Sequence, residues 1–316
     1  MTEYRLRSDL RRTRIRDYAF PLGLIPRDIR PPIQGYTVRY VTSEEDAPDT
    51  YAFHVVVTHE RVAEIFEATL ALLPPEVEGI LEVNSFDAYR QMDVYLSDEL
   101  ISREQFRRCW SHYRPFFLED GTVGVGAKAE EPFVEVFLDQ WKGISIHVPL
   151  SLREAAESVL ESVELEEAAM LWTEEEDPLG DADVQHVLDT SQPQWADFDD
   201  IILDLRHELV LALNVDPDEN LDEAGRDLGF TLWHGVIIVE VAGHDAPTRF
   251  MTLWATARSI HQVMDLVEHE LDAQSYGTLQ EVYTLERVAY DERPEALADL
   301  EPRLTEARLH RLEFDA

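Results

Sequence analysis

Residues 135–147, "EVFLDQWKGISIH", decide how this sequence folds. Two runs of alternating apolar residues flank the polar, glycine-containing turn "DQWKG", and this pattern is typical of a β-hairpin. Successive side chains point to opposite faces of a strand, so pairing Leu138 with Ile144 and Val136 with Ile146 collects aliphatic residues on one face. A slip by one residue would set aliphatic side chains against polar ones. The sequence therefore predicts this register.

The same register places Glu135 opposite His147 on the other face of the hairpin. Their Cβ atoms would lie about 5 Å apart. A carboxylate that orients an imidazole is a common way to prepare a general base, but such a pair is also ordinary cross-strand decoration. Ser145 shares this face as a strand residue, without the sharp turn that exposes a nucleophile. Glu135 and His147 are the catalytic candidates only if the chain is an enzyme, and a structural role is favoured.

Several other segments predict a strand that leads into an amphipathic helix. The predicted helices cover residues 58–73, 102–117, 151–163 and 259–271. Three of them begin with a serine followed three residues later by Glu or Gln, the spacing of a capping box, at Ser102, Ser151 and Ser259. Because hairpin signals are frequent between these helices, the sequence predicts an α+β fold with mainly antiparallel or mixed sheets and capped amphipathic helices.

The clearest compositional break lies between residues 154 and 205, which contain 17 acidic residues and no Lys or Arg. Part of this segment also lacks any sustained apolar period, which is typical of a linker. The sequence therefore predicts two regions joined by an acidic segment. The predicted parts are an Arg-rich N-terminal arm (1–40), an α+β domain (41–168), an acidic linker or surface loop (169–200) and a second α+β domain (201–316).

The formal charge of the 316-residue chain is −38, from 65 acidic and 27 basic residues. Such a surface is repelled by phosphates and anionic lipids, which argues against direct nucleic-acid binding by the acidic body and against membrane binding. No apolar run approaches the ~20 residues of a membrane helix, and the N-terminus has no apolar signal-peptide core. Cys109 is the only cysteine, so we expect a cytoplasmic protein without an intramolecular disulfide.

Residues 1–40 differ from the rest of the chain. They carry nine Arg and four acidic residues, a formal charge of +5, whereas the remaining 18 basic and 61 acidic residues give −43. The binding candidates in this arm are Arg11, Arg12 and Arg14. No aromatic residue is interleaved for base stacking, so we expect the arm to lie on its own acidic body rather than on nucleic acid.

Metal and cofactor motifs are incomplete. Spacing 1, 3, 5 and 7 of a calcium-binding EF-hand loop is matched by Asp216, Asp218, Asn220 and Asp222. Leu221 stands where the loop needs glycine, so these residues are a weak candidate and a simple turn is favoured. The glycines of "GTVGVGAK" (121–128) lack phosphate-loop spacing. The sequence predicts no metal and no cofactor.

The function favoured by these observations is that of an acidic binding or regulatory protein that acts through protein–protein contacts. Its expected partner is a basic protein, or a second copy through the Arg-rich arm, and Trp172 and Trp195 in the acidic segment could supply apolar anchors. The alternatives are an enzyme with a site around Glu135 and His147, and an acidic mimic of nucleic acid.

Overall fold

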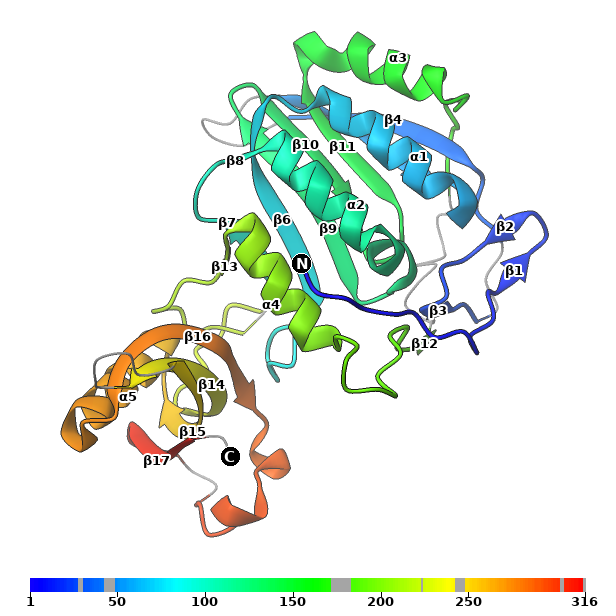
Figure 1. Ribbon diagram of the computed structural model, residues 1–316. Helices are drawn as coiled ribbons and strands as arrows, with labels where there is room; N and C mark the ends of the chain where they lie inside the picture. The colour runs from blue at the N-terminus through cyan, green and yellow to red at the C-terminus, as the bar shows by residue number, and fades with distance from the viewer. Residues whose placement is uncertain are drawn as a thin grey trace. The chain divides into compact units, whose positions relative to one another are not determined.

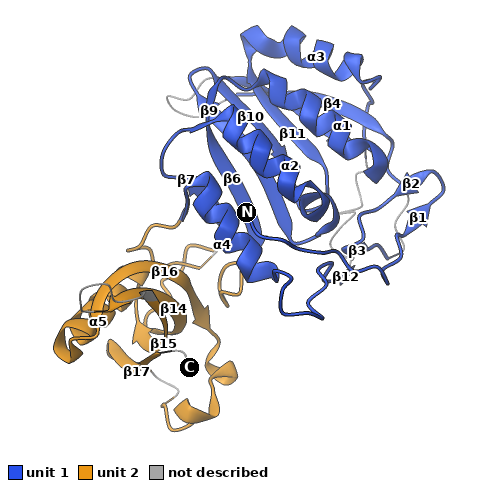
Figure 2. Cartoon of the chain, viewed as in Figure 1, with its two compact units in different colours: residues 1–83, 94–214 blue, residues 84–93, 215–316 orange. Residues whose placement is uncertain are grey.

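The computed structural model of this chain describes residues 1–27, 31–42, 49–171, 183–222, 224–241, 248–301 and 304–314. The chain forms two compact units, each built from two segments (Figure 2). Unit 1 comprises residues 1–83 and 94–214, and unit 2 comprises residues 84–93 and 215–316. The boundaries predicted from the sequence divide the chain elsewhere, and they stay predictions.

Unit 1 is built on a nine-stranded sheet in which every register given between named strands is antiparallel. The strand order is β13-β7-β6-β9-β10-β11-β5-β4, and β8 pairs with β6 outside that path. In this order the strands span Leu211–Leu213, Met92–Ser97, Glu76–Asn84, Val123–Glu130, Phe133–Leu138, Ile144–Pro149, Thr50–Val56 and Gly35–Val41, and β8 spans Ile101–Ser102. Together with the helices, these sheets confirm the predicted α+β class.

The hairpin of β10 and β11 has the predicted register. Its pairs are Glu135–His147, Val136–Ile146, Phe137–Ser145 and Leu138–Ile144. The turn is held by Asp139, whose Oδ1 atom accepts the backbone N–H groups of Trp141 and Gly143, each at 2.8 Å. Lys142 in this turn has a φ of +70°. Local side-chain alternation therefore fixed the pairing of these two strands.

The helices of unit 1 share one core with the sheet, and Figure 1 shows α1 and α2 lying across one sheet face. They are α1 (His59–Thr69), α2 (Arg103–Glu119), α3 (Arg153–Ser162) and α4 (Phe198–Leu209). Short 3₁₀ turns cover Leu70–Leu72 and Leu150–Leu152.

Two of the predicted helix caps have different outcomes. Ser102 caps α2 as predicted, because its side chain accepts the backbone N–H of Gln105 at 3.1 Å. The expected cap at Ser151 is absent: the chain leaves β11 through a 3₁₀ turn, and α3 begins at Arg153 without a side-chain cap. The 3₁₀ turn takes up the residues that the sequence pattern assigned to the first helical turn.

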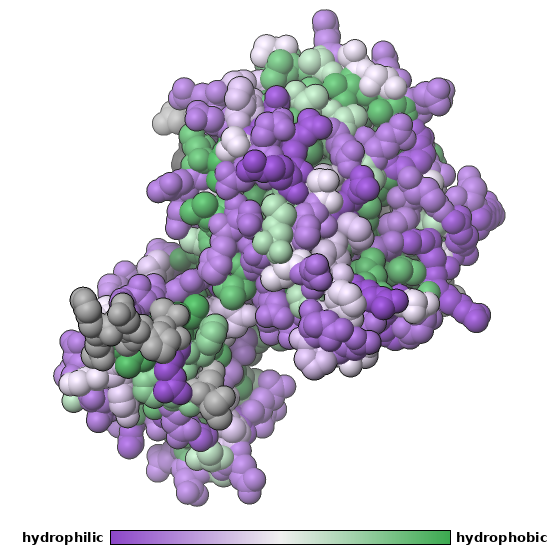
Figure 3. All heavy atoms as spheres, in the orientation of Figure 1, coloured by the Kyte–Doolittle hydropathy of each residue, from purple (hydrophilic) through white to green (hydrophobic). Residues whose placement is uncertain are grey.

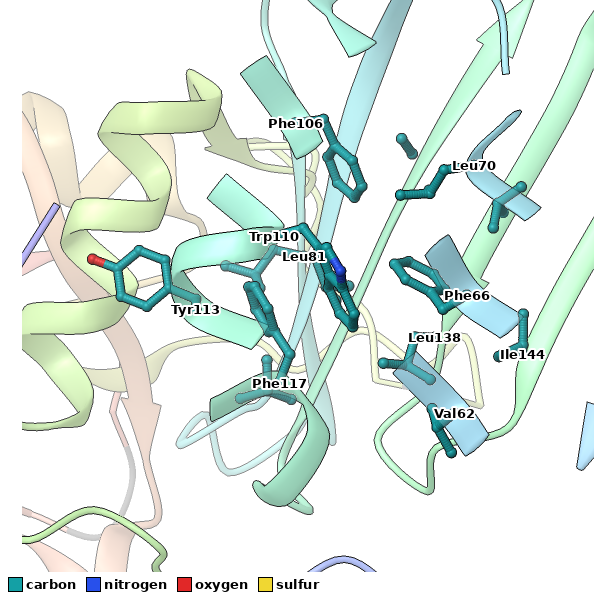
Figure 4. Packing of buried hydrophobic residues seen from close by; sticks show 14 of the residues in the cluster. Val62, Phe66, Leu70, Leu81, Phe106, Trp110, Tyr113, Phe117, Leu138 and Ile144 are labelled. Atoms are coloured by element: carbon teal, nitrogen blue, oxygen red, sulfur yellow. The ribbon is translucent and has the colours of Figure 1, made fainter. Parts of the chain in front are cut away.

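The core of unit 1 consists of aromatic rings from α1 and α2 packed on aliphatic side chains of the sheet (Figure 4). The ring centroids of Phe66 and Trp110 are 4.5 Å apart, and Trp110 stacks on Phe117 with an interplanar angle of 4°. Leu138 and Ile144 of the hairpin are fully buried in the same cluster. Because the helices close this sheet face, polar groups of the strands gather on the opposite face.

The N-terminal segment and residues 183–200 also pack in unit 1. Three side chains of the first segment, Tyr4, Leu6 and Leu10, contact the core, and three of the second, Val187, Leu188 and Ala196, are buried in it. Two small sheets hold these segments, β1 (Arg14–Ile15) with β2 (Tyr18–Ala19) and β3 (Leu24–Ile25) with β12 (Asp183–Val184). Isolated apolar residues reach the core here instead of a periodic stripe, which is why the sequence showed no element.

Unit 2 is a four-stranded antiparallel sheet with one helix. Its strand order is β16-β14-β15-β17. The elements are β14 (Thr231–Val241), β15 (Thr248–Ala257), α5 (Ile260–Gln274), β16 (Gly277–Val288) and β17 (Arg308–Phe314), with 3₁₀ turns at Tyr290–Glu292 and Glu295–Leu297. The predicted cap of α5 is present, since Ser259 accepts the backbone N–H of Gln262 at 3.3 Å.

An ion pair fixes residues 84–93 within unit 2. The carboxylate of Asp87 is fully buried and accepts both the Nε–H of Arg287, at 3.0–3.1 Å, and the backbone N–H of the same residue, at 2.9 Å. The Arg287 guanidinium lies 5.3 Å from the ring centroids of both Trp233 and Tyr89. A buried charge is tolerated only with such partners, so this loop is held firmly.

The face of the molecule seen in Figure 3 is mainly hydrophilic, as the acidic composition predicts. In the described part of the chain, no helix is both long enough and apolar enough to cross a membrane.

Candidate functional site

The sheet face opposite the helices carries the predicted catalytic pair. Glu135 and His147 are cross-strand neighbours, and both are half-buried. Among the described residues, the structure gives no hydrogen bond or ion pair between them. The other strand neighbour of Glu135 is Lys128, whose amine is 2.9 Å from the carboxylate of Glu130 and 3.3 Å from that of Glu78. The two residues lie together, but no bond orients the imidazole as a base.

A second group on this face, centred on His54, was missed by sequence reasoning. Ser145 Oγ lies 3.5 Å from His54 Nδ1. Asp139 approaches the same ring, because a Cβ built on Gly143 would meet Asp139 Oδ2 at 2.7 Å and His54 Cε1 at 3.1 Å. Burial lowers the pKa of His54 and raises the pKa of Asp139. The Ser145–His54 contact is at the outer limit of a hydrogen bond, and β5 and β11 are far apart in sequence, so no local pattern announces the group.

Beneath the hairpin turn lies a buried amine. Lys142 is 3% exposed, and its Nζ donates to the backbone carbonyl of Val123 at 2.8 Å. Burial lowers the pKa of Lys142 to about 8, although the nearby charges of Asp120 and Asp139 act in the opposite direction. The amine is thus enclosed by protein and bonded to backbone, so it serves the fold rather than an open site.

The Arg-rich arm lies on unit 1, and two of its three candidate residues form ion pairs there. Arg12 contacts both carboxylate oxygens of Glu119, at 2.6 and 3.1 Å, and donates to the carbonyl of Phe20 at 2.8 Å. Arg14 pairs with Glu60. Arg11 is exposed. The arm therefore makes contacts with its own acidic body, while its role toward any partner stays a prediction.

The carboxylate of Glu119, at the end of α2, is contacted by four donor nitrogens from Arg12, His59 and Leu22. We call this group of residues the clasp. Besides Arg12, the Glu119 carboxylate contacts His59 Nε2 at 3.1 Å and the backbone N–H of Leu22 at 2.8 Å. Burial alone would raise the pKa of Glu119, but the hydrogen bonds from His59 and Arg12 outweigh it and hold the pKa at about 2. The clasp fastens the arm to the end of α2.

Closer to the N-terminus, the arm pairs through its backbone with the acidic segment. The N–H of Arg7 donates to the carbonyl of Val187, and the N–H of Asp189 donates to the carbonyl of Arg5, each at 2.8 Å. Leu6 and Leu188 form an antiparallel bridge between these two bonds. In Figure 1 the N-terminal chain accordingly runs beside the segment that leads into α4. Two segments of opposite charge thus meet through their backbones.

Beside this pairing lies a cavity of about 720 Å³. Its walls are residues 7–9 of the arm, residues 186–191 and 197–199 of the acidic segment, and Asp120 at the end of α2. The apolar part of the lining is Val187, Leu188 and Phe198. The volume falls within the roughly 300–1,000 Å³ of small-ligand sites. Sequence reasoning found the acidic segment but not this concavity, because its walls come from three distant parts of the chain.

The cavity is strongly negative. Five aspartates and one arginine line it, which gives a formal charge of −4 with His186 neutral. A hydrogen bond from Arg7 lowers the pKa of Asp9, and hydrogen bonds from Ser191 lower that of Asp189, so both are ionised at pH 7. Clustered charge in a concave wall attracts ions of the opposite sign. The arrangement suits a cationic ligand that also offers apolar surface.

Comparison of the chain with known proteins found no match. No protein-family model, no curated protein and no solved structure matches the chain. The candidate site is therefore argued only from the residues of this chain.

The structure describes one of the two tryptophans that were predicted as apolar anchors. Trp172 lies outside the described residues. Trp195 is half-buried, and its indole Nε1 is a buried donor with no partner among the described residues. It does not line the cavity. Phe198, which sequence reasoning did not select, is the aromatic residue that lines the cavity among the described residues.

The weak calcium candidate does not gather its acidic side chains around one point. Asp216 accepts the N–H of Asp218, and Asp218 contacts His261 Nδ1 at 3.1 Å. Asn220 donates toward Asp227 and Gly229, whereas Asp222 binds Arg226. In the described part of the chain, no group of three or more His, Cys, Asp or Glu is placed to hold a metal ion. The loop has the bonds of a turn.

Proposed function

We propose that this chain is a binding protein that holds a cationic segment of a basic partner protein in the acidic cavity of unit 1. The observation that carries the proposal is the cavity itself: about 720 Å³ in volume, lined by five aspartates and floored by apolar side chains. Negative charge would steer a basic partner to this site and exclude nucleic acid. The apolar floor would add affinity that charge alone cannot provide.

Two features support a partner rather than a buried internal role for these acids. The donors to the Asp189 side chain come from uncharged Ser191, including its backbone N–H at 3.1 Å, and Asp9 pairs with Arg7. Among the lining residues, five aspartates stand against one arginine, so the cavity has a net negative charge. Each exposed ion pair that a partner completes contributes only about 0–1 kcal/mol, so we expect binding that depends on several pairs together.

The test is binding of a fluorescein-labelled basic peptide, measured by anisotropy at about 0.01 M and about 1 M salt, where charges are screened over about 30 and 3 Å. We expect binding at low salt and its loss at high salt. Replacing two cavity acids, Asp189→Asn with Asp199→Asn, should weaken binding about tenfold, at up to ~1 kcal/mol for each charge.

A matched double variant in unit 2, Asp272→Asn with Asp291→Asn, removes the same charge from exposed positions outside the cavity. It should bind the peptide like the unaltered chain. Equal losses in the two double variants would mean that only the total charge matters, and the cavity would then have no specific role.

A further inference from the structure

We infer that the cavity selects arginine over lysine, with Asp120 as the anchor for the guanidinium group and Phe198 as the surface on which it stacks. This inference rests on the proposed function, because it names the side chain that the same cavity takes from a basic partner. It is carried by the burial of Asp120, by the bonds that Asp120 already makes, and by the aromatic ring in the lining of the same cavity.

Asp120 differs from the other four aspartates of the cavity because it is buried. It is 2% exposed, although it lines the cavity. Its Oδ1 atom accepts the N–H of Thr122 at 2.8 Å and the hydroxyl of the same residue at 2.5 Å. The structure gives Oδ2 no bond among the described residues. This oxygen is not among the fully buried atoms without a partner, so it keeps access to a donor that enters the cavity.

The neighbouring amine does not take this place. Lys142 is near enough for its charge and that of Asp120 to interact, but its Nζ donates to the carbonyl of Val123 instead. Lys142 therefore balances part of the charge while leaving an acceptor open. The only arginine of the cavity, Arg7, uses Nε and one terminal nitrogen on Asp9 and the other on the carbonyl of His186. A ligand in the cavity would therefore give Asp120 a further donor.

The shape of the lining favours a guanidinium over an ammonium. Phe198 is half-buried, its ring lies edge-on to that of Phe116 with centroids 6.0 Å apart, and Asp197 and Asp199, its neighbours in sequence, also line the cavity. A guanidinium is planar, is weakly hydrated, stacks on aromatic rings and presents paired donors to carboxylates, whereas an ammonium is a compact, strongly hydrated point charge. A cavity whose lining combines an aromatic ring with several carboxylates is therefore better matched by arginine than by lysine.

The experiment compares two labelled peptides of equal charge, one alternating serine with arginine and the other alternating serine with lysine. Binding of each to the full chain is measured by fluorescence anisotropy at low salt. We expect the arginine peptide to bind about three- to fivefold more tightly. Asp120→Asn should cost the arginine peptide about tenfold, the effect of losing one charge-assisted hydrogen bond, because asparagine keeps an acceptor for Thr122 and removes only the charge. Phe198→Leu should reduce the preference and spare most of the lysine binding.

The outcomes separate the inference from the proposed function. If neither peptide binds, the proposed function fails. If both bind equally, or if Asp120→Asn binds the arginine peptide as the unaltered chain does, the cavity binds charge without selecting arginine and the inference fails alone. Circular dichroism checks that each variant is folded. If Asp120→Asn does not fold, the peptide preference of the unaltered chain and of Phe198→Leu decides. Asp291→Asn, in unit 2, is the control and should change neither affinity.

Discussion

Removing Arg12 tests the clasp that fastens the N-terminal arm to unit 1. The variant is Arg12→Ala, which leaves the carboxylate of Glu119 with His59 and the N–H of Leu22 as its remaining partners. Glu119 is 10% exposed and Arg12 is 22% exposed, so water replaces the lost guanidinium only in part. We expect the unfolding free energy of unit 1 to fall, because a mostly buried carboxylate loses the two hydrogen bonds that Arg12 donates.

The magnitude follows from the titration of Glu119. Its pKa is held at about 2 in the folded chain, against a reference of 4.5. At about 1.36 kcal/mol per pKa unit, this difference is worth about 3 kcal/mol at pH 7. His59 is the larger cause of this lowering and Arg12 the next, so the loss of Arg12 should cost about 1.5 kcal/mol, at most half of the total. A carboxyl whose folded pKa is lowered stabilises the fold fully above its unfolded pKa. That stability is lost as the pH falls from 4.5 toward 2.

The assay is urea unfolding followed by tryptophan fluorescence, at pH 7 and at pH 3. These values lie on either side of the sequence isoelectric point of about 4.4 and avoid precipitation there. At pH 3 less than half of the stabilisation from Glu119 remains, so the difference between the variant and the unaltered chain should shrink to below about 1 kcal/mol.

The matched control is Arg11→Ala, which removes the same charge one residue away from an exposed side chain. It should change the unfolding free energy by less than about 0.5 kcal/mol at either pH. The reasoning is refuted if Arg11→Ala and Arg12→Ala destabilise equally, or if the cost of Arg12→Ala is the same at pH 3 as at pH 7.

Three further predictions concern other parts of the chain. Asp87→Ala should cost unit 2 about 3–5 kcal/mol in urea unfolding by leaving the guanidinium of Arg287 buried without its partner, and exposed Asp98→Ala should cost under ~0.5 kcal/mol. The pKa of Lys142 is lowered to about 8 in the folded chain, so between pH 8 and 10.5 the unfolded chain binds one more proton than the folded chain. The unfolding free energy should therefore rise across that range. Lys142→Met should lack this rise, and a variant with the same pH profile as the unaltered chain would contradict the lowered pKa. Gly277→Ala should lower the melting temperature of unit 2 by several degrees, because φ is +138° and the added Cβ would lie 2.0 Å from a backbone carbonyl oxygen of β14; an unchanged melting temperature would count against it.

The sequence by itself determined the local features of this chain. The register of residues 135–147 follows from side-chain alternation, which allows only one pairing that buries aliphatic residues on a single face. The caps at Ser102 and Ser259 follow from a hydroxyl that reaches a backbone N–H three residues on. These interactions join residues close in sequence, so composition and spacing were enough to predict them and the α+β class.

Tertiary structure alone decided the candidate sites. Glu135 and His147 lie opposite each other as predicted, but the contact that their face offers is between Ser145 and His54, 91 residues apart. The acidic cavity needs the arm, the end of α2 and the start of α4 in one place. The opposite charges predicted that the arm would lie on the acidic body, but electrostatic attraction does not specify where on that body it lies. Backbone bonds between residues 5–7 and 187–189, with Leu6 beside Leu188 in the core, fix the place and thereby create the concavity.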